Sequence, residues 1–266
     1  MDIGTFWVGE SLGKLEMTCL KSMTAAGHSV VLYSYESIAE LPAGIERRDA
    51  NEILPVVRAN VYLEAKKYAQ LADIFRYRMI ASTGLAWLDT DVVLLKSLPQ
   101  TEWIWARETR KKVGNAVLYL PPESKTLLSL IKLTDQDEIT LPTNWRYHLV
   151  GGASADQRQA ALLAMSGVAQ KIIDLPYATI GPHALTYFAL IHEEFGKTMG
   201  NHTFYPFPHS RIVANTLRPM KHPLKLDEEV VGVHLYGGPL RKAMRESGQS
   251  EFRRHSLIGA MKRKFG

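Results

Sequence analysis

Two carboxylates, those of Asp89 and Asp91, stand one residue apart where the apolar residues 85–88 give way to polar sequence. In an extended backbone, residues two apart point to the same side, so the pair can share one divalent cation. Ligation through oxygen suits Mg²⁺ or Mn²⁺. Such a cation would neutralise the charge that develops on a departing diphosphate. The triplet therefore predicts a metal-dependent transfer site, although two acidic residues near a strand end more often form a solvated turn.

A helix is predicted directly before this strand, and Gly84 ends it. Asp73 and Arg76 lie three residues apart on one face of that helix, so they can form an ion pair. A surface pair is the commoner explanation for such spacing. Here, however, the next strand delivers Asp89 and Asp91 to its carboxyl end, where open α/β sheets collect their ligands. The apolar stripe of the helix consists of Ala65, Ala69, Ala72, Phe75 and Met79.

The run from Ala72 to Asp91 resembles the sugar-binding region of the DXD-motif glycosyltransferases. That family includes α-1,4-galactosyltransferases, initiating mannosyltransferases and clostridial glucosylating toxins. Its motif reads approximately Asp-x-x-Arg, a helix, and then Gly-Gly-x-Tyr-x-Asp-x-Asp. This chain has Thr83 and Gly84 for the paired glycines and Trp87 for the tyrosine, and it keeps the spacing.

The resemblance implies a hexosyltransferase with a GT-A-like fold that uses a UDP- or GDP-hexose and Mn²⁺ (or Mg²⁺), and that retains the anomeric configuration. By the same resemblance, Asp73 and Arg76 contact the donor sugar and diphosphate. Asp89 contacts the ribose and sugar beside the metal, and Asp91 binds the metal itself. The expected catalytic residues are Asp89, Asp91 and Arg76.

Further donor-site residues are expected outside this run. Asn115 resembles the asparagine that opens a strand lining the donor sugar in the family, and Gly181-Pro182 resembles a late Gly-Pro step. Trp7 and Tyr33 stand near the ends of the first two predicted strands, where an aromatic ring can stack on a base. For each of these residues, a turn, a helix start or a place in the core is the plainer explanation.

His234 resembles the histidine that completes the metal site of retaining galactosyltransferases. In those enzymes a glycine follows at three residues and then a base. Gly237 fits the first offset, whereas Leu240 occupies the position of the base and Arg241 comes next. The predicted metal ligands are therefore Asp91, Asp89 and His234, with a core or surface histidine as the alternative for His234.

Short apolar runs and helical periodicity predict one α/β domain over residues 1–240. Its sheet is expected to be mixed and mostly parallel, with helices on its flanks. Strands are predicted at residues 3–8, 29–35, 85–88, 103–106, 116–120 and 230–236, and the chain is apolar again at residues 92–95. Helices are predicted at residues 12–26, 65–83, 122–133, 155–165 and 182–195, and residues 44–58 are expected to be irregular.

A basic C-terminal tail is expected over residues 241–266. It carries eight Lys and Arg against two Glu, so its charge is +6, whereas the first 240 residues total −1. Its apolar residues recur at helical spacing, which predicts a basic amphipathic helix on an anionic membrane surface; a helix docked on its own domain is the alternative. The cations are Arg241, Lys242, Arg245, Arg253, Arg254, Lys262, Arg263 and Lys264.

The remaining composition is that of an ordinary globular protein, with 46% hydrophobic and 22% charged residues. Cys19 is the single cysteine, which excludes a disulfide framework, and no long apolar run is present. We therefore expect a cytoplasmic enzyme of cell-surface glycan assembly, peripheral on the inner face of the membrane, that binds a nucleotide sugar, a glycan or glycolipid acceptor and no nucleic acid.

Two other functions fit parts of the sequence. Residues 88–93 also fit the Asp-x-Asp signature of haloacid-dehalogenase-like phosphatases, with Asp89 as nucleophile and Asp91 as acid and base. Those enzymes need a later Gly-Asp-x-x-x-Asp run, which this sequence lacks. A non-enzymatic basic membrane-binding module would explain the tail, but not the ordered charges between Asp73 and Asp91.

Overall fold

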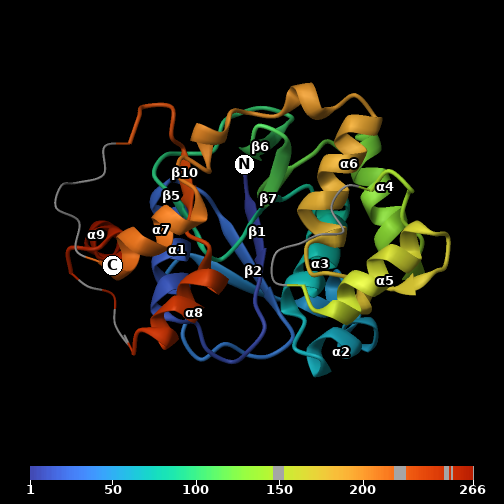
Figure 1. Cartoon of the computed structure of the whole chain (residues 1–266). Coiled ribbons are helices and arrows are strands. Elements are labelled where there is room, and N and C mark those ends of the chain that lie inside the picture. The colour runs from blue at the N-terminus through green and yellow to red at the C-terminus, as the bar shows by residue number, and fades with distance from the viewer. Residues whose placement is uncertain (146–152, 219–225, 249–251, 253, 266) are drawn as a thin grey trace.

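A six-stranded sheet runs through the centre of the computed structural model, which describes residues 1–145, 153–218, 226–248, 252 and 254–265 (Figure 1). Its order is β3-β2-β1-β4-β7-β6. The first four strands in this order are parallel, and β7 and β6 are antiparallel additions. The predicted mixed, mostly parallel sheet is confirmed. The strands are β1 (Ile3–Phe6), β2 (Val30–Ser34), β3 (Ile45–Asp49), β4 (Ala86–Leu88), β6 (Ile104–Thr109) and β7 (Lys112–Tyr119).

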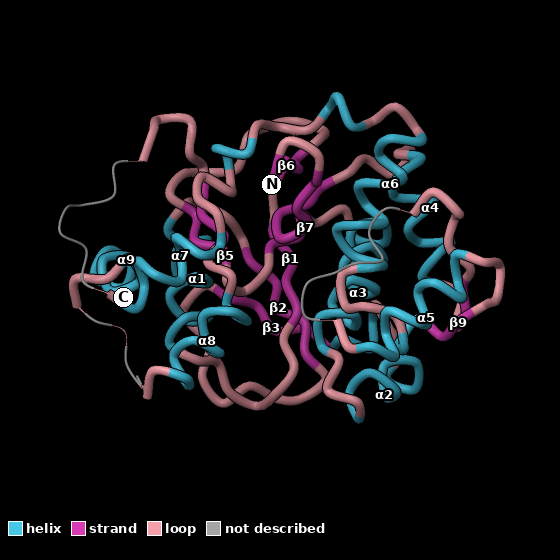
Figure 2. Tube along the Cα trace, viewed as in Figure 1, coloured by secondary structure: helices cyan, strands magenta, loops and turns pink. Residues whose placement is uncertain are grey.

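Helices cover both faces of this sheet (Figure 2). On one side of the sheet lie α2 (Val56–Glu64), α3 (Tyr68–Thr83), α4 (Lys125–Thr134), α5 (Ala155–Met165) and α6 (Ala184–Ile191), of which α3 and α6 contact its strands. The other side holds α1 (Lys14–Ala25), α7 (His209–Leu217), α8 (Gly237–Glu246) and α9 (Leu257–Phe265). Two short antiparallel pairs complete the described structure: β5 (Val92–Leu94) with β10 (Gly232–His234), and β8 (Glu138–Ile139) with β9 (Gln170–Lys171).

The strand order contains a topological switch point between β1 and β4. The chain proceeds from β1 outward to β2 and β3, and then returns through α3 to place β4 on the opposite side of β1. Open α/β sheets bind ligands in the crevice at the carboxyl ends of the strands on either side of such a reversal. The residue that follows β4 is Asp89, and the residue that follows β1 is Trp7.

The segment 44–58 differs from its prediction, because it contains β3, a short 3-10 turn (Ala50–Glu52) and the start of α2. β3 has the sequence Ile-Glu-Arg-Arg-Asp, which shows no apolar run. As an edge strand it needs only backbone pairing with β2. Arg47 stabilises it locally, since its guanidinium donates to Ser34 and to the carbonyl of Glu36.

The C-terminal segment is integrated into the domain. The predicted boundary between residues 240 and 241 falls inside α8, and Leu240 is buried. Leu257, Ile258 and Met261 of α9 are buried against α1, β5 and β10. The apolar side of the tail is thus occupied by its own domain, as in the alternative to membrane insertion. Of the tail cations, Arg253 lies outside the described residues.

Glu194 caps α4, which begins after Ser124 and not at Pro122 as predicted. The Glu194 carboxylate is 7% exposed, and it accepts hydrogen bonds from the Ser124 hydroxyl and from the backbone N–H groups of Lys125 and Thr126. These donors outweigh burial and lower the pKa of Glu194. A helix start on the domain surface is thereby joined to the chain that follows α6.

We predict that Glu194→Ala lowers the free energy of unfolding by about 2–3 kcal/mol, because it leaves buried donors unsatisfied. Urea unfolding at neutral pH measures the loss. Because folding lowers the pKa of Glu194, the ionised carboxyl stabilises the fold at neutral pH. The difference in stability between the parent and Glu194→Ala should therefore shrink as acid protonates this carboxyl. Glu123→Ala, at an exposed neighbouring position, is the control. Equal stability of the two variants would contradict the capping role.

Candidate metal and donor site

Arg76 is a buried cation on the inner face of α3. Its side chain is 4% exposed, and that of Asp73 one turn earlier is 7% exposed. A buried charge is tolerated only when it is paired and hydrogen-bonded. α3 ends at Gly84, whose φ of 68° favours glycine, and the chain turns there directly into β4. This local path brings Asp89, at the exit of β4, back alongside Arg76.

Arg76 joins three separate elements. Its Nη2 donates to Asp89 Oδ1 at 2.9 Å, and its Nη1 lies 3.2 Å from Asp73 Oδ1. Nη1 also donates to the carbonyl of Asn115 on β7 at 2.8 Å. The amide of Asn115 donates to Asp73 Oδ1 at 2.8 Å, which closes the network. The predicted residues Asp73, Arg76, Asp89 and Asn115 therefore form one connected group.

Trp87 holds the Asp89 carboxylate from a second direction. Its Nε1 donates to Asp89 Oδ1 at 2.7 Å, and the Arg76 guanidinium lies 4.8 Å from the centre of its ring. One carboxylate oxygen thus receives two donors, which fixes its orientation. The sequence showed only that tryptophan replaces the tyrosine of the family motif, so this hydrogen bond went unpredicted.

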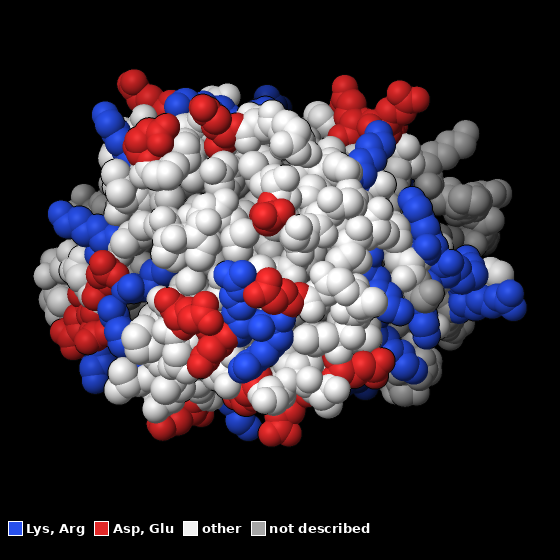
Figure 3. Space-filling model, turned by 180° about the vertical axis from the view of Figure 1, so that it is seen from behind, with Lys and Arg blue, Asp and Glu red and all other residues white. Residues whose placement is uncertain are grey.

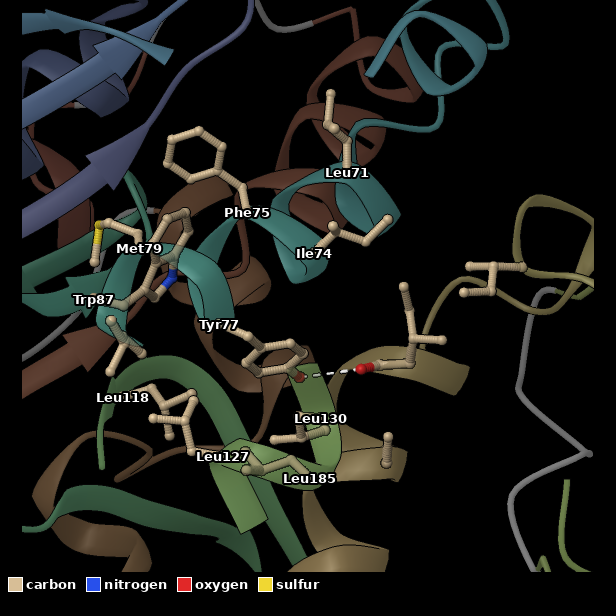
Figure 4. Close-up of a cluster of buried hydrophobic side chains, with 14 of the residues drawn as sticks. Leu71, Ile74, Phe75, Tyr77, Met79, Trp87, Leu118, Leu127, Leu130 and Leu185 are labelled. Atoms are coloured by element: carbon tan, nitrogen blue, oxygen red, sulfur yellow. Dashed lines mark hydrogen bonds between the residues drawn. The ribbon is translucent and has the colours of Figure 1, made fainter. Parts of the chain in front are cut away.

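Besides Arg76 and Asn115, the Asp73 carboxylate lies against a kinked π-helical segment (Thr179–His183). A β-carbon built on Gly181 would approach Asp73 Oδ2 to 2.2 Å, so only glycine fits there. The Tyr77 hydroxyl donates to the carbonyl of Ile180 at 3.1 Å and anchors the segment on α3 (Figure 4). The predicted Gly181-Pro182 step therefore borders the site.

Asp89, Asp91 and His234 form a second group beside this network. One potential ligand atom from each lies within 4.8 Å of the others. Asp91 directly precedes β5, and the antiparallel pairing of β5 with β10 places His234 opposite Val92. The side chains are 25%, 17% and 14% exposed, so solvent reaches the group although it is mostly enclosed. The three predicted metal ligands are therefore brought together.

The two oxygens of Asp91 have different surroundings. Oδ2 accepts the backbone N–H of Gly237 at 2.6 Å, at the start of α8. Oδ1 is buried 3.3 Å from His234 Nε2, and it has no hydrogen-bond partner among the residues that the structure describes. One oxygen is thus held by the backbone, and the other faces the imidazole of His234.

Burial and charge shift the pKa values of these groups in opposite directions. Burial raises the pKa of Asp73 to about 7 despite the nearby Arg76, and burial also raises the pKa of Asp89. For Asp91, His234 and the Gly237 N–H overcome burial and lower the pKa to about 2. Asp91 overcomes burial in turn to raise the pKa of His234. Asp91 is therefore the most strongly ionised carboxylate of the site.

Trp7 and Tyr33, the two residues predicted to stack on a base, differ in their exposure to solvent. Trp7 is partly exposed in the loop after β1, and its Nε1 donates to the carbonyl of Ser11. Tyr33 is 1% exposed, with its ring centre 5.6 Å from that of Phe75 in the core. Its ring cannot stack on a base from there, because β2 is buried along its whole length. We therefore leave Tyr33 out of the donor site.

Comparisons with known proteins add little to this geometry. No protein-family model matches the sequence, and no curated protein matches it. Among solved structures, the chain is similar to a protein described as PaToxG glycosyltransferase, at 11% sequence identity and a TM-score of 0.46, over 71% of this chain and 67% of that one. A similarity at this level assigns no function to the chain.

We predict that Arg76→Ala lowers the free energy of unfolding by about 3–5 kcal/mol, because it leaves buried carboxylates without their cation. Arg48→Ala is the matched control, since Arg48 pairs with Glu46 on the surface and its side chain is 42% exposed. An exposed pair contributes about 0–1 kcal/mol. Chemical denaturation of both variants gives the comparison. Similar losses for the two would show that Arg76 is not the buried centre of the site.

Proposed function

We propose that this chain is a metal-dependent glycosyltransferase that moves a hexose from a nucleotide sugar to an acceptor hydroxyl. The observation that carries the proposal is the continuity of two groups at the switch point of the sheet. The buried network of Asp73, Arg76 and Asn115 shares Asp89 with the cluster that also contains Asp91 and His234. A binding site for a nucleotide sugar needs polar side chains that hydrogen-bond the sugar and carboxylates that bind the cation.

The cluster fits a divalent cation. Two carboxylates and one imidazole suit Mn²⁺, and Mg²⁺ is the alternative with harder ligands. Asp91 Oδ1 is buried and has no hydrogen-bond partner among the described residues, so a cation bound there would satisfy it. When bound, the cation would supply charge neutralisation to the diphosphate leaving group.

The protein residues supply mainly position and charge. Arg76 is too deeply buried to reach a diphosphate in this conformation, so we assign it the task of orienting Asp89 and Asp73. Asn115 would face the hexose, Asp73 would hold the Asn115 amide in position, and Trp7 would border the nucleotide. Transfer with retention is proposed from the resemblance to the DXD-motif family. The phosphatase alternative is weaker, because the sequence lacks the Gly-Asp-x-x-x-Asp run that such enzymes need.

Peripheral attachment to the anionic inner face of the cell membrane is the second part of the proposal. Lys262, Arg263 and Lys264 in the last turn of α9 are exposed, while the apolar side of α9 is buried. Seen from behind, Lys and Arg side chains gather at the right-hand edge, the end of the molecule that holds α9 (Figure 3). Among the residues described, no helix has the length and apolar content to cross a bilayer.

This placement would serve an acceptor seated in a membrane, such as a lipid-linked glycan in polysaccharide or lipopolysaccharide assembly. Because the apolar residues are docked, attachment would be electrostatic and would not require insertion. Each Lys or Arg near an anionic surface gains about 1 kcal/mol, within a Debye length of about 8–10 Å.

We predict that Asp91→Asn abolishes Mn²⁺-dependent binding and turnover of the nucleotide sugar. The amide keeps the size of the side chain but loses the charge that a cation requires. Calorimetric titration with UDP- and GDP-hexoses, with and without Mn²⁺, measures binding, and thermal unfolding checks the fold. Asp137→Asn, at an exposed acidic position of the α4–β8 turn, is the control. Normal donor binding by Asp91→Asn would refute the metal role.

We predict that reversing the charges of Lys262, Arg263 and Lys264 to glutamate weakens binding to anionic vesicles by at least about tenfold. Truncation is unsuitable, because it would remove buried α9 residues. Co-sedimentation with phosphatidylglycerol vesicles at low and high salt measures binding, with phosphatidylcholine vesicles for comparison. The matched control reverses Lys111, Lys125 and Lys132, which are exposed on other elements. Equal binding by both triple variants, or binding that salt does not weaken, would refute attachment through α9.

A further inference from the structure

Tyr236 has an unusual backbone conformation directly beside the metal cluster. Three described residues other than glycine have a positive φ: Lys66, Glu193 and Tyr236. The first two follow the ends of α2 and α6, where a left-handed residue commonly closes a helix. Tyr236 instead precedes α8, with φ 53° and ψ 58°. An aromatic residue held in this region without a helix to close is strained, and such strain concentrates at functional sites.

The conformation of Tyr236 positions groups at two of the three candidate ligands. It turns the chain so that the next N–H, that of Gly237, donates to Asp91 Oδ2 at 2.6 Å. It also places the Tyr236 ring centre 4.1 Å from that of His234. The approach at Asp91 is close, because a β-carbon at residue 237 would lie 3.0 Å from Oδ2 and would press on the carboxylate.

The imidazole of His234 contacts two aromatic rings. The ring of Tyr205 meets the imidazole edge-on, with ring centres 5.7 Å apart and an angle of 86° between the planes. The ring of Tyr236 lies closer and makes a tilted contact. The hydroxyl of Tyr236 reaches Glu108 on β6 at 3.4 Å, and Glu108 pairs with Lys112 on β7. Tyr236 therefore links the start of α8 to the β6–β7 hairpin, and its ring lies beside the imidazole of His234. The ring contact is the close one, and the contact of the hydroxyl is long for a hydrogen bond.

We propose that Tyr236 is a positioning residue that holds Asp91 and His234 in the metal-binding arrangement before the metal arrives. The left-handed backbone aims the Gly237 N–H at one oxygen of Asp91, and the ring fixes the plane of the imidazole. This role rests on the proposed function, since it presupposes that the cluster binds a cation. It requires the affinity for the cation to depend on the aromatic ring more than on the hydroxyl.

The test is titration of the full chain with Mn²⁺ alone, followed by the electron paramagnetic resonance signal of unbound Mn²⁺. Tyr236→Phe should change the affinity by less than about threefold, because the lost hydrogen bond is long. Tyr236→Ala and Tyr236→Gly should each weaken it by about tenfold or more, the range typical of residues that orient metal ligands. The glycine variant should melt at a higher temperature than the alanine variant, since glycine relieves the backbone strain.

Phe265→Ala is the control, because Phe265 packs against the same buried cluster as Tyr236 but belongs to α9. It should lower the melting temperature and leave Mn²⁺ affinity unchanged. If the parent protein binds no Mn²⁺, both the metal site and the role of Tyr236 are overturned. If the parent binds and Tyr236→Ala binds equally well, the role of Tyr236 alone is overturned. Affinities that follow melting temperature across all variants, Phe265→Ala included, would also overturn it.

Discussion

The burial of the Arg76 guanidinium is the constraint on which the rest of the site depends. A guanidinium cannot lose its proton at ordinary pH, so a side chain that is 4% exposed must find negative partners within reach. It takes them from α3 and from the exit of β4, and a carbonyl from β7 supplies the third contact. The positions of α3, β4 and β7 around the switch point are therefore fixed together, and none can shift without exposing an unpaired charge.

The same pairing leaves the site short of positive charge. Asp73, Asp89 and Asp91 bring three carboxyl groups into one enclosed region, and Arg76 is a single fixed cation among them. Burial raises the pKa values of Asp73 and Asp89 despite the nearby Arg76, whereas His234 lowers that of Asp91. A divalent cation beside Asp89 and Asp91 would supply the missing charge and would favour ionisation of both.

How much of this was predictable depended on whether an interaction is local in the sequence. The run from Asp73 to Asp91 could be read because helical periodicity, the glycine stop and the next strand are all local patterns. β3 could not, because an edge strand of charged residues shows no apolar run. α8 could not either, because Gly237-Gly238-Pro239 reads as a break, whereas the helix begins there and Asp91 accepts its first N–H.

Residue roles followed the same division. His234 was suggested by resemblance, but its place opposite Val92 arises from a strand pairing across more than half the chain, which no local pattern reveals. Tyr33 was proposed because it stands near the end of a predicted strand, but the ring belongs to the core, since β2 is buried along its whole length. The bond from Trp87 to Asp89 joins residues two apart, yet only the folded geometry shows that the ring edge turns toward the carboxylate.

The C-terminal segment connects the site to the proposed membrane surface through rigid contacts. The first N–H of α8, that of Gly237, donates to Asp91. Arg241 in the second turn of α8 donates to the buried Glu16 of α1 at 2.6 Å. α9 packs on that same helix through Leu257 and Ile258. The exposed cations of α9 therefore stand on a helix that packs against α1, and α1 in turn contacts α8 through Glu16 and Arg241. Because electrostatic attraction acts only within about a Debye length, a surface held by these cations would fix the orientation of the whole domain. On the proposed function, the direction from which a membrane-seated acceptor approaches Asp91 would then be set by the fold and not by diffusion of a tethered domain.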